Sequence, residues 1–190
     1  KRQCEVVSLS NAIDMVALER LSSHTKGIIV VGTENPRCGD KAFTDAVALI
    51  SDKLGWPVIA DALNPLRSHA EAIPLLITHY DAFLGDAHKA KELMPTATLH
   101  IGNLPTSKML RAWLSSLEAV SFLLTSRPIN TDPLHRIATP LYGDAQALAE
   151  HLPPQLVEAN WSKLWLENEL KTANELDSKM LSIETFFEGK

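Results

Sequence analysis

The sequence lacks the features that mark several large classes of protein. It has no run of lysine or arginine, and 18 basic against 23 acidic residues give a net charge of −5, which argues against a general nucleic-acid binder. We expect neither a signal peptide nor a membrane span, because no apolar stretch of the sequence is long enough to cross a bilayer. Its two cysteines, Cys4 and Cys38, match no metal-binding or redox spacing. We therefore expect a cytoplasmic protein with no membrane or nucleic-acid partner.

The short motifs of common catalytic and cofactor sites are also missing. The first candidate strand-to-helix turn reads GTENPRCG and lacks the GxGxxG spacing that lets a pyrophosphate approach the backbone. The patterns GxxxxGK[ST], GxSxG and HExxH do not occur, and the seven histidines show no metal-ligand spacing. We therefore expect this chain to supply no catalytic, cofactor-binding or metal-binding residue.

What is present is typical of a globular α/β domain. Apolar residues make up 45% and charged residues 22% of 190 positions, enough for one well-cored domain. Short apolar runs alternate with helical periods, which predicts a doubly wound, mostly parallel sheet of five or six strands with helices on both faces. The predicted strands are Gly27–Gly32, Pro57–Ala60, Thr96–Ile101, Ala119–Thr125 and Ile137–Leu141.

Helical periods and capping residues place the helices between these strands. Gly55 is typical of a helix C-cap, Gly143-Asp144 of a helix start, and Asp61–Ala72 of a long loop. The predicted helices are Ser8–Ser23, Asp40–Leu54, Ile73–Gly85, Asp86–Met94, one beginning at Thr106 or Ser107, one ending at His151, and a helical region over Gln155–Phe187.

The chain divides at Pro153-Pro154, which is typical of a domain edge. We predict an N-terminal linker helix over residues 1–26, a central α/β domain over 27–152 and a helical linker over 153–190. Because the sequence does not begin with methionine, we expect it to be a piece of a longer polypeptide.

Two segments of the chain contain candidates for ligand contact. Lys108 falls in the first turn of a predicted helix, where the helix dipole disfavours a cation unless an anion shares the site. Asp61 and Arg67 lie in a loop at the carboxyl end of a strand, where open α/β sheets bind ligands. The alternatives, a solvated surface lysine and a solvated loop with an incidental arginine, are left open by the residues alone.

Four segments follow one another in the order GIIVVG, GWPVIADALNPLR, HIGNLPTSKMLRAW and DPLHRIATPLYGDAQAL, roughly over Lys26–Leu152. Together they resemble the central domain of the MenD family, the thiamine-diphosphate-dependent SEPHCHC synthases of menaquinone and phylloquinone biosynthesis. The resemblance implies the middle of three α/β domains, with a Rossmann-like fold whose cofactor site is unused. The outer domains, including one beyond residue 190, would bind thiamine diphosphate and Mg²⁺ through a Glu and a Gly-Asp-Gly…Asn motif absent here.

The resemblance also implies an activity for the whole enzyme. The family decarboxylates 2-oxoglutarate and adds the resulting succinyl carbanion to isochorismate, so the partners of this chain would be the two cofactor-binding domains and these substrates, in a homo-oligomer. The fragment alone would be inactive. The Ser-Lys pair implies substrate binding by Ser107 and Lys108, with Thr106 and Arg67 as further candidates; some relatives follow this lysine with arginine, where this chain has Met109.

Two other functions remain possible on the same sheet. One is a nucleotide- or effector-binding regulatory module, which would need the glycine-rich first turn that is missing. The other is a structural spacer between catalytic domains.

Overall fold

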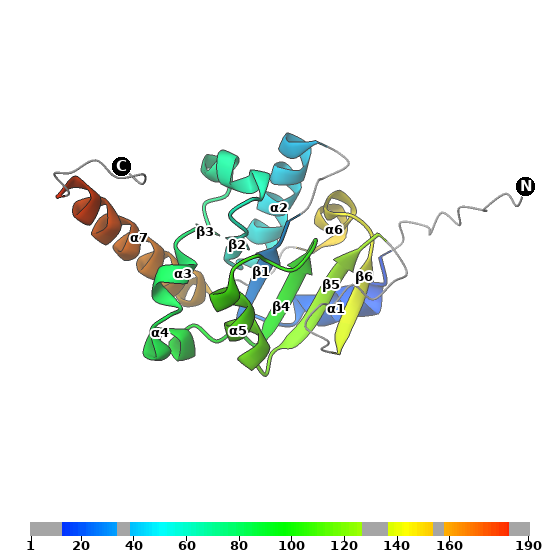
Figure 1. Cartoon of the computed structure of the whole chain (residues 1–190). Helices are drawn as coiled ribbons and strands as arrows, with labels where there is room; N and C mark the ends of the chain where they lie inside the picture. The colour runs from blue at the N-terminus through cyan, green and yellow to red at the C-terminus, as the bar shows by residue number, and fades with distance from the viewer. Residues whose placement is uncertain (1–12, 34–38, 127–136, 154–157, 183–190) are drawn as a thin grey trace, which may run out of the picture.

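A six-stranded, all-parallel sheet forms the centre of the computed structural model, which describes residues 13–33, 39–126, 137–153 and 158–182 (Figure 1). Its strand order is β3-β2-β1-β4-β5-β6. The strands are β1 (Gly27–Val31), β2 (Val58–Ala60), β3 (Leu76–Ile77), β4 (Ala97–Ile101), β5 (Val120–Thr125) and β6 (Ala138–Tyr142). The predicted fold class is therefore confirmed, and the sheet has six strands, the higher of the two predicted numbers.

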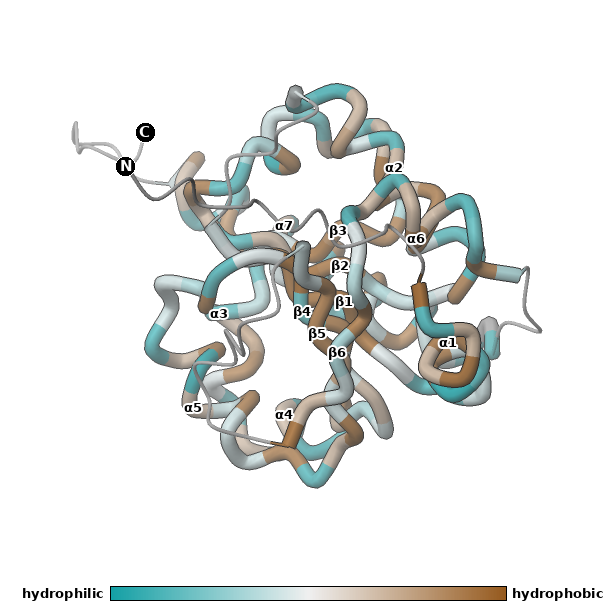
Figure 2. The backbone as a smooth tube through the Cα atoms, turned by 90° about the vertical axis from the view of Figure 1, so that its right-hand side faces the viewer, coloured by the Kyte–Doolittle hydropathy of each residue, from teal (hydrophilic) through white to brown (hydrophobic). Residues whose placement is uncertain are grey.

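Helices cover both faces of this sheet, as the continuous burial of β1 requires. The helices are α1 (Met15–Ser22), α2 (Asp40–Leu54), the 3₁₀ helix η1 (Pro65–Ala72), α3 (Tyr80–Phe83), α4 (Ala87–Glu92), α5 (Lys108–Ser116), α6 (Ala145–His151) and α7 (Ala159–Leu181). Helices α1, α2, η1 and α6 pack on one face, and α3, α5 and the first half of α7 on the other. Figure 2 shows the hydrophobic strands between these two layers.

The first half of α7 is part of the second core. Trp165 is fully buried and meets Phe83, Trp113 and Trp161 edge to face, at centroid distances of 6.0, 5.8 and 6.1 Å. The Trp161 indole N–H donates to the carbonyl of Gly27 at 2.8 Å, which fastens α7 to the start of β1. The second half of α7 is largely exposed and extends away from the sheet (Figure 1). The division of the chain at residue 153 stays a prediction, but the packing of α7 ties its first half to the sheet.

Several predicted elements agree closely with the structure. Helix α2 has the predicted bounds, and Gly55 ends it with a left-handed φ of 64°. Asp144 caps α6 by accepting a hydrogen bond from the Ala147 amide. Both cases depend on local capping chemistry, which a sequence displays directly.

The segment Ile73–Gly85 is not the single helix that its apolar residues suggested. Leu76–Ile77 is strand β3, which pairs in parallel with Val58 and Ile59 of β2, and only Tyr80–Phe83 is helical. A short apolar run fits a buried strand and a buried helix equally well, so the pairing with β2 decides between them.

Two further predictions were wrong, one of a loop and one of a helix start. The predicted long loop after β2 contains η1, because the Asn64 side chain caps the Leu66 amide and Pro65 occupies the first helical position. Helix α1 begins at Met15 rather than Ser8, because Asp14 has extended backbone angles and accepts a hydrogen bond from the Val16 amide. Residues 8–12 lie outside the described part of the chain.

Candidate functional site

The carboxyl edge of the sheet brings together the loops after β1, β2 and β4. In the order β3-β2-β1-β4-β5-β6, the chain runs outward in opposite directions from β1 and β4. This point is where doubly wound sheets open a crevice that accepts a nucleotide. The residues predicted to bind substrate all lie in loops or helix starts at this edge.

At the described part of this edge, residues of the chain itself fill the crevice. The Gly32 amide donates to the Ile101 carbonyl at 3.0 Å, and the Asn103 side chain donates to the Thr33 carbonyl at 2.8 Å. A Cβ atom built on Gly32 would lie 1.5 Å from the backbone oxygen of Asn103. The Asn103 backbone thus packs against Gly32, where a nucleotide phosphate would need to approach, which weighs against the nucleotide-binding alternative.

Asp61 is an acidic side chain at this edge whose carboxylate accepts three hydrogen bonds. It is fully buried; its Oδ1 accepts from the Leu63 amide at 2.9 Å, and its Oδ2 accepts from the Thr106 amide at 2.6 Å and hydroxyl at 2.8 Å. Burial pushes the pKa of Asp61 upward, but these hydrogen bonds and the charge of Arg67 outweigh it and hold the pKa below its usual value. The carboxylate therefore ties the β2 loop to the loop before α5.

Ser107 is the N-cap of α5 and Lys108 is its first helical residue. The Ser107 Oγ accepts from the Leu110 amide at 3.0 Å and donates to the Asp81 carboxylate. The two carboxylates of Asp61 and Asp81 thus supply negative charge at the positive end of the α5 dipole. The argument that Lys108 needs an external anion is weaker than the sequence suggested, because the fold provides two.

The Lys108 side chain is exposed beside this arrangement. Among the described residues, no ion pair or hydrogen bond engages its ammonium group. It is therefore a cation at the carboxyl edge that a ligand can reach without displacing a partner seen in those residues.

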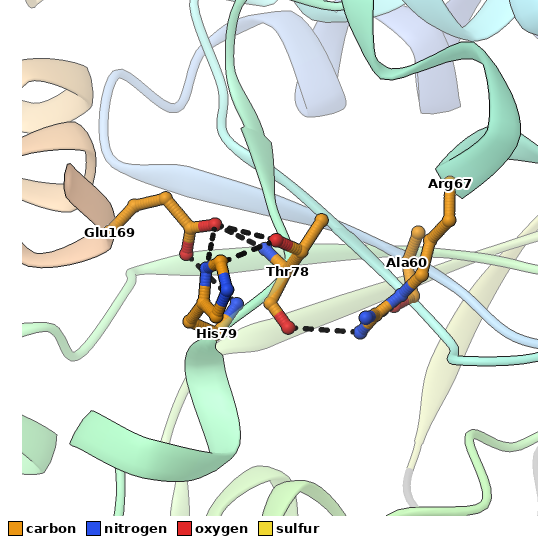
Figure 3. A network of polar contacts seen from close by, with 5 residues as sticks. All are labelled: Ala60, Arg67, Thr78, His79 and Glu169. Carbon is orange, nitrogen blue, oxygen red and sulfur yellow. Dashed lines mark hydrogen bonds and ion pairs between the residues drawn. The ribbon is translucent and has the colours of Figure 1, made fainter. Parts of the chain in front are cut away.

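Arg67 lies at the same edge but uses its donors within the fold (Figure 3). Its Nε and Nη2 donate to the Ala60 carbonyl at 3.3 and 3.2 Å, and Nη2 also donates to the Thr78 carbonyl at 3.0 Å. Its guanidinium lies 5.7 Å from the centre of the Tyr80 ring. Arg67 therefore braces the ends of β2 and β3, and its predicted contact with substrate gains no support from this geometry.

A buried carboxylate on α7 is the main feature that the sequence reasoning missed. Glu169 is 8% exposed and accepts from the Thr78 amide and hydroxyl at 2.9 and 2.7 Å and from the His79 amide and Nδ1 at 3.0 and 2.8 Å (Figure 3). The surrounding sequence, ENELKTANELDSK, is polar and by itself favours a solvated helix face. The available signal was spacing, because Glu169 follows the buried Trp165 by four positions and so shares its face.

The described residues show no cluster of side chains suited to a metal ion. No group of three His, Cys, Asp or Glu side chains among them could hold a metal. A small hollow over β4, β5 and β6, lined by His100, Asn103 and Ser121 among others, has room for about one water molecule. Within the same ranges, no helix combines the length and hydrophobicity that a bilayer crossing requires. Cys4, Cys38 and the segment DPLHR at 132–136 lie outside the described residues.

Comparisons with known proteins give the family. Residues 6–186 match the family model described as "Middle domain of thiamine pyrophosphate". A 2-succinyl-5-enolpyruvyl-6-hydroxy-3-cyclohexene-1-carboxylate (SEPHCHC) synthase of Trichodesmium erythraeum is 34% identical over 190 residues, which cover 98% of this chain and 32% of that enzyme. A synthase of the same name from Synechococcus elongatus is 40% identical over 146 residues, covering 76% of this chain and 25% of the enzyme.

The chain thus spans about a third or less of the length of these curated relatives. The match to the family model extends over the sheet and both flanking helices, α1 and α7. The all-parallel sheet and the family match agree, and the chain belongs to the middle domains of thiamine pyrophosphate enzymes, with SEPHCHC synthases as its relatives.

Proposed function

We propose that this chain is the middle domain of a SEPHCHC synthase and that Lys108 binds a substrate carboxylate there. The family match over residues 6–186, together with relatives of that name at 34% and 40% identity, supports the first part. The whole enzyme would decarboxylate 2-oxoglutarate and add the remaining succinyl unit to isochorismate.

Thiamine diphosphate and Mg²⁺ do not fit the described residues of this chain. No metal-binding cluster occurs among them, and Gly32 and Asn103 fill the edge where a diphosphate would approach the sheet. The neighbouring domains of the longer enzyme would hold the cofactor, and the isolated chain would be inactive. The function of this domain would then be to present groups to the substrate.

The position of Lys108 carries the second part of the proposal. Its ammonium is exposed at the carboxyl edge, and Asp61 and Asp81 are hydrogen-bonded to its neighbours Thr106 and Ser107 rather than paired with it. Both proposed substrates are dicarboxylates. One charge pair at about 4 Å contributes about 1 kcal/mol in water and about 4 kcal/mol at an effective dielectric of about 20. The strength of the contact between Lys108 and a carboxylate therefore depends on how well the site is shielded from water.

Substitution of Lys108 in the full-length enzyme tests this proposal. Lys108→Ala is expected to raise the KM for isochorismate or 2-oxoglutarate by about tenfold, which equals about 1.4 kcal/mol. Lys108→Arg should recover only part of the loss, because it keeps the positive charge but replaces a compact ammonium with a planar guanidinium. The melting temperature should hardly change, since an exposed lysine contributes within about 0.5 kcal/mol.

Lys91→Ala is the matched control. Lys91 is an exposed lysine on α4, whose end leads into the start of β4, at the opposite edge of the sheet. It should leave both KM values unchanged. If Lys108→Ala also leaves both KM values and kcat at the wild-type level, Lys108 is a solvated surface residue and the proposal for it is wrong.

A further inference from the structure

We infer that Asp61 is a positioning residue for the Lys108 site, because its buried carboxylate fixes the loop from which α5 begins. This inference rests on the proposed function of Lys108 and names the residue that would hold it in place. Asp61 would touch no substrate itself; it would act through Thr106, two positions before Lys108.

The first support is the way Asp61 is anchored to the sheet. It directly follows β2, and its amide donates to the Val31 carbonyl at the end of β1, at 2.9 Å. Arg67 holds the preceding carbonyl, that of Ala60, at 3.2 Å, and its charge attracts the Asp61 carboxylate. Asp61 is therefore fixed at the ends of two paired strands, β1 and β2, and can serve as an attachment point for a loop.

The second support is the pair of hydrogen bonds that Thr106 donates to Asp61. One carboxylate oxygen accepts both the Thr106 amide at 2.6 Å and the Thr106 hydroxyl at 2.8 Å. Hydrogen bonds to an ionised acceptor are short and about twice as strong as neutral ones. Ser107, the next residue, donates its hydroxyl to the Asp81 carboxylate. Two consecutive residues before Lys108 are thus attached to carboxylates on different elements.

The third support is the position that Asp61 occupies. At the start of a helix, a bound anion accepts hydrogen bonds from exposed main-chain amides. The Asp61 carboxylate already takes the Thr106 amide at the entry of α5. A substrate carboxylate would therefore be recognised by the Lys108 ammonium rather than by that amide. The position of this ammonium depends on the loop that Asp61 holds.

Asp61→Asn tests the inference with little change in shape. Asparagine has one acceptor oxygen, so its amide group must face the Leu63 or the Thr106 amide, donor against donor. In the full-length enzyme, well below its melting temperature, Asp61→Asn should raise by about fivefold the same KM that Lys108→Ala raises, with a smaller change in kcat. Combined with Lys108→Ala, it should raise that KM little further, because the group it positions is already gone.

Two further variants keep the test decisive. Thr106→Ala removes only the hydroxyl donor at an exposed position, so it should fold and show a smaller effect of the same kind if Asp61→Asn does not fold. Asp45→Asn is the matched control, because Asp45 is exposed on α2 and pairs only with Lys41 among the described residues. It should leave both KM values unchanged.

The outcomes separate the two proposals. If Lys108→Ala changes neither KM, the proposed function of Lys108 is wrong and the inference is wrong with it. If Lys108→Ala raises a KM but Asp61→Asn and Thr106→Ala lower only stability, Asp61 has a structural role alone. If the Asp61→Asn and Lys108→Ala effects on KM multiply in the double variant, Asp61 acts independently of Lys108. Either of the last two results overturns the inference and leaves the proposed function intact.

Discussion

Gly32 is a single residue that decides how the carboxyl edge of the sheet is used. It follows β1 at the position where related doubly wound folds keep a glycine so that a phosphate can approach the backbone. Here the space is used by the chain, since Gly32 bonds Ile101 and accepts from the Asn64 side chain at 2.6 Å. The space left by the missing Cβ of Gly32 is therefore used for packing between loops and not for binding a ligand.

Gly32→Ala should destabilise the protein. Its Cβ would lie 1.5 Å from the Asn103 oxygen and 2.6 Å from the Asn103 carbonyl carbon, and both are backbone atoms that cannot rotate away. Overpacking of this kind costs about 1–3 kcal/mol or more, and each kcal/mol lowers the melting temperature of a chain of this size by about 2–4 °C. Gly85→Ala is the control, because its Cβ would lie 3.7 Å from Met109. Equal melting temperatures for the two variants would contradict the observed contact between the loops.

At the scale of elements, α7 is held to the sheet by one apolar cluster and one buried carboxylate. Trp161 and Trp165 supply the cluster, while Glu169 satisfies the donors at the turn between β3 and α3. Thr78 joins this network to the edge of the sheet, because its carbonyl accepts from Arg67 (Figure 3). The helix and the loops of the candidate site are therefore connected through a short series of hydrogen bonds.

Glu169→Gln should loosen α7. A glutamine side chain has one acceptor oxygen and must present its amide group to the Thr78 or the His79 donors, which leaves a buried donor unsatisfied. The expected loss in the free energy of unfolding is about 1–3 kcal/mol, measured by urea denaturation, with faster hydrogen exchange at the Thr78 amide.

Glu167→Gln on the same helix is the control for this change. Glu167 is exposed and pairs with Lys163 at 3.7 Å, so its loss should cost within about 0.5 kcal/mol. If Glu169→Gln unfolded at the same urea concentration as Glu167→Gln, the Glu169 network would contribute nothing to the docking of α7.

For the whole molecule, the sequence allowed the prediction of those features that depend on residues close together in the chain. The apolar run of β1, the glycine cap of α2 and the helix start near Lys108 follow from neighbouring residues. The contacts that build the site join distant positions: Asp61 and Thr106 are 45 residues apart, and Thr78 and Glu169 are 91. Each residue could be noticed alone, as Asp61 was, but the partners depend on strand order and on where α7 packs.

The last prediction concerns how the whole chain folds. All four tryptophans are buried, and three of them, Trp113, Trp161 and Trp165, join α5 and α7 over one face of the sheet. Because α7 packs into the same core as the strands, we expect the isolated chain to unfold in one cooperative transition. Tryptophan fluorescence, which reports the docking of α7, and far-ultraviolet circular dichroism, which reports all helices and strands, should then give the same melting temperature. A fluorescence transition several degrees below the dichroism transition would show that α7 detaches first, as a linker would, and that the cooperative unit ends near residue 153.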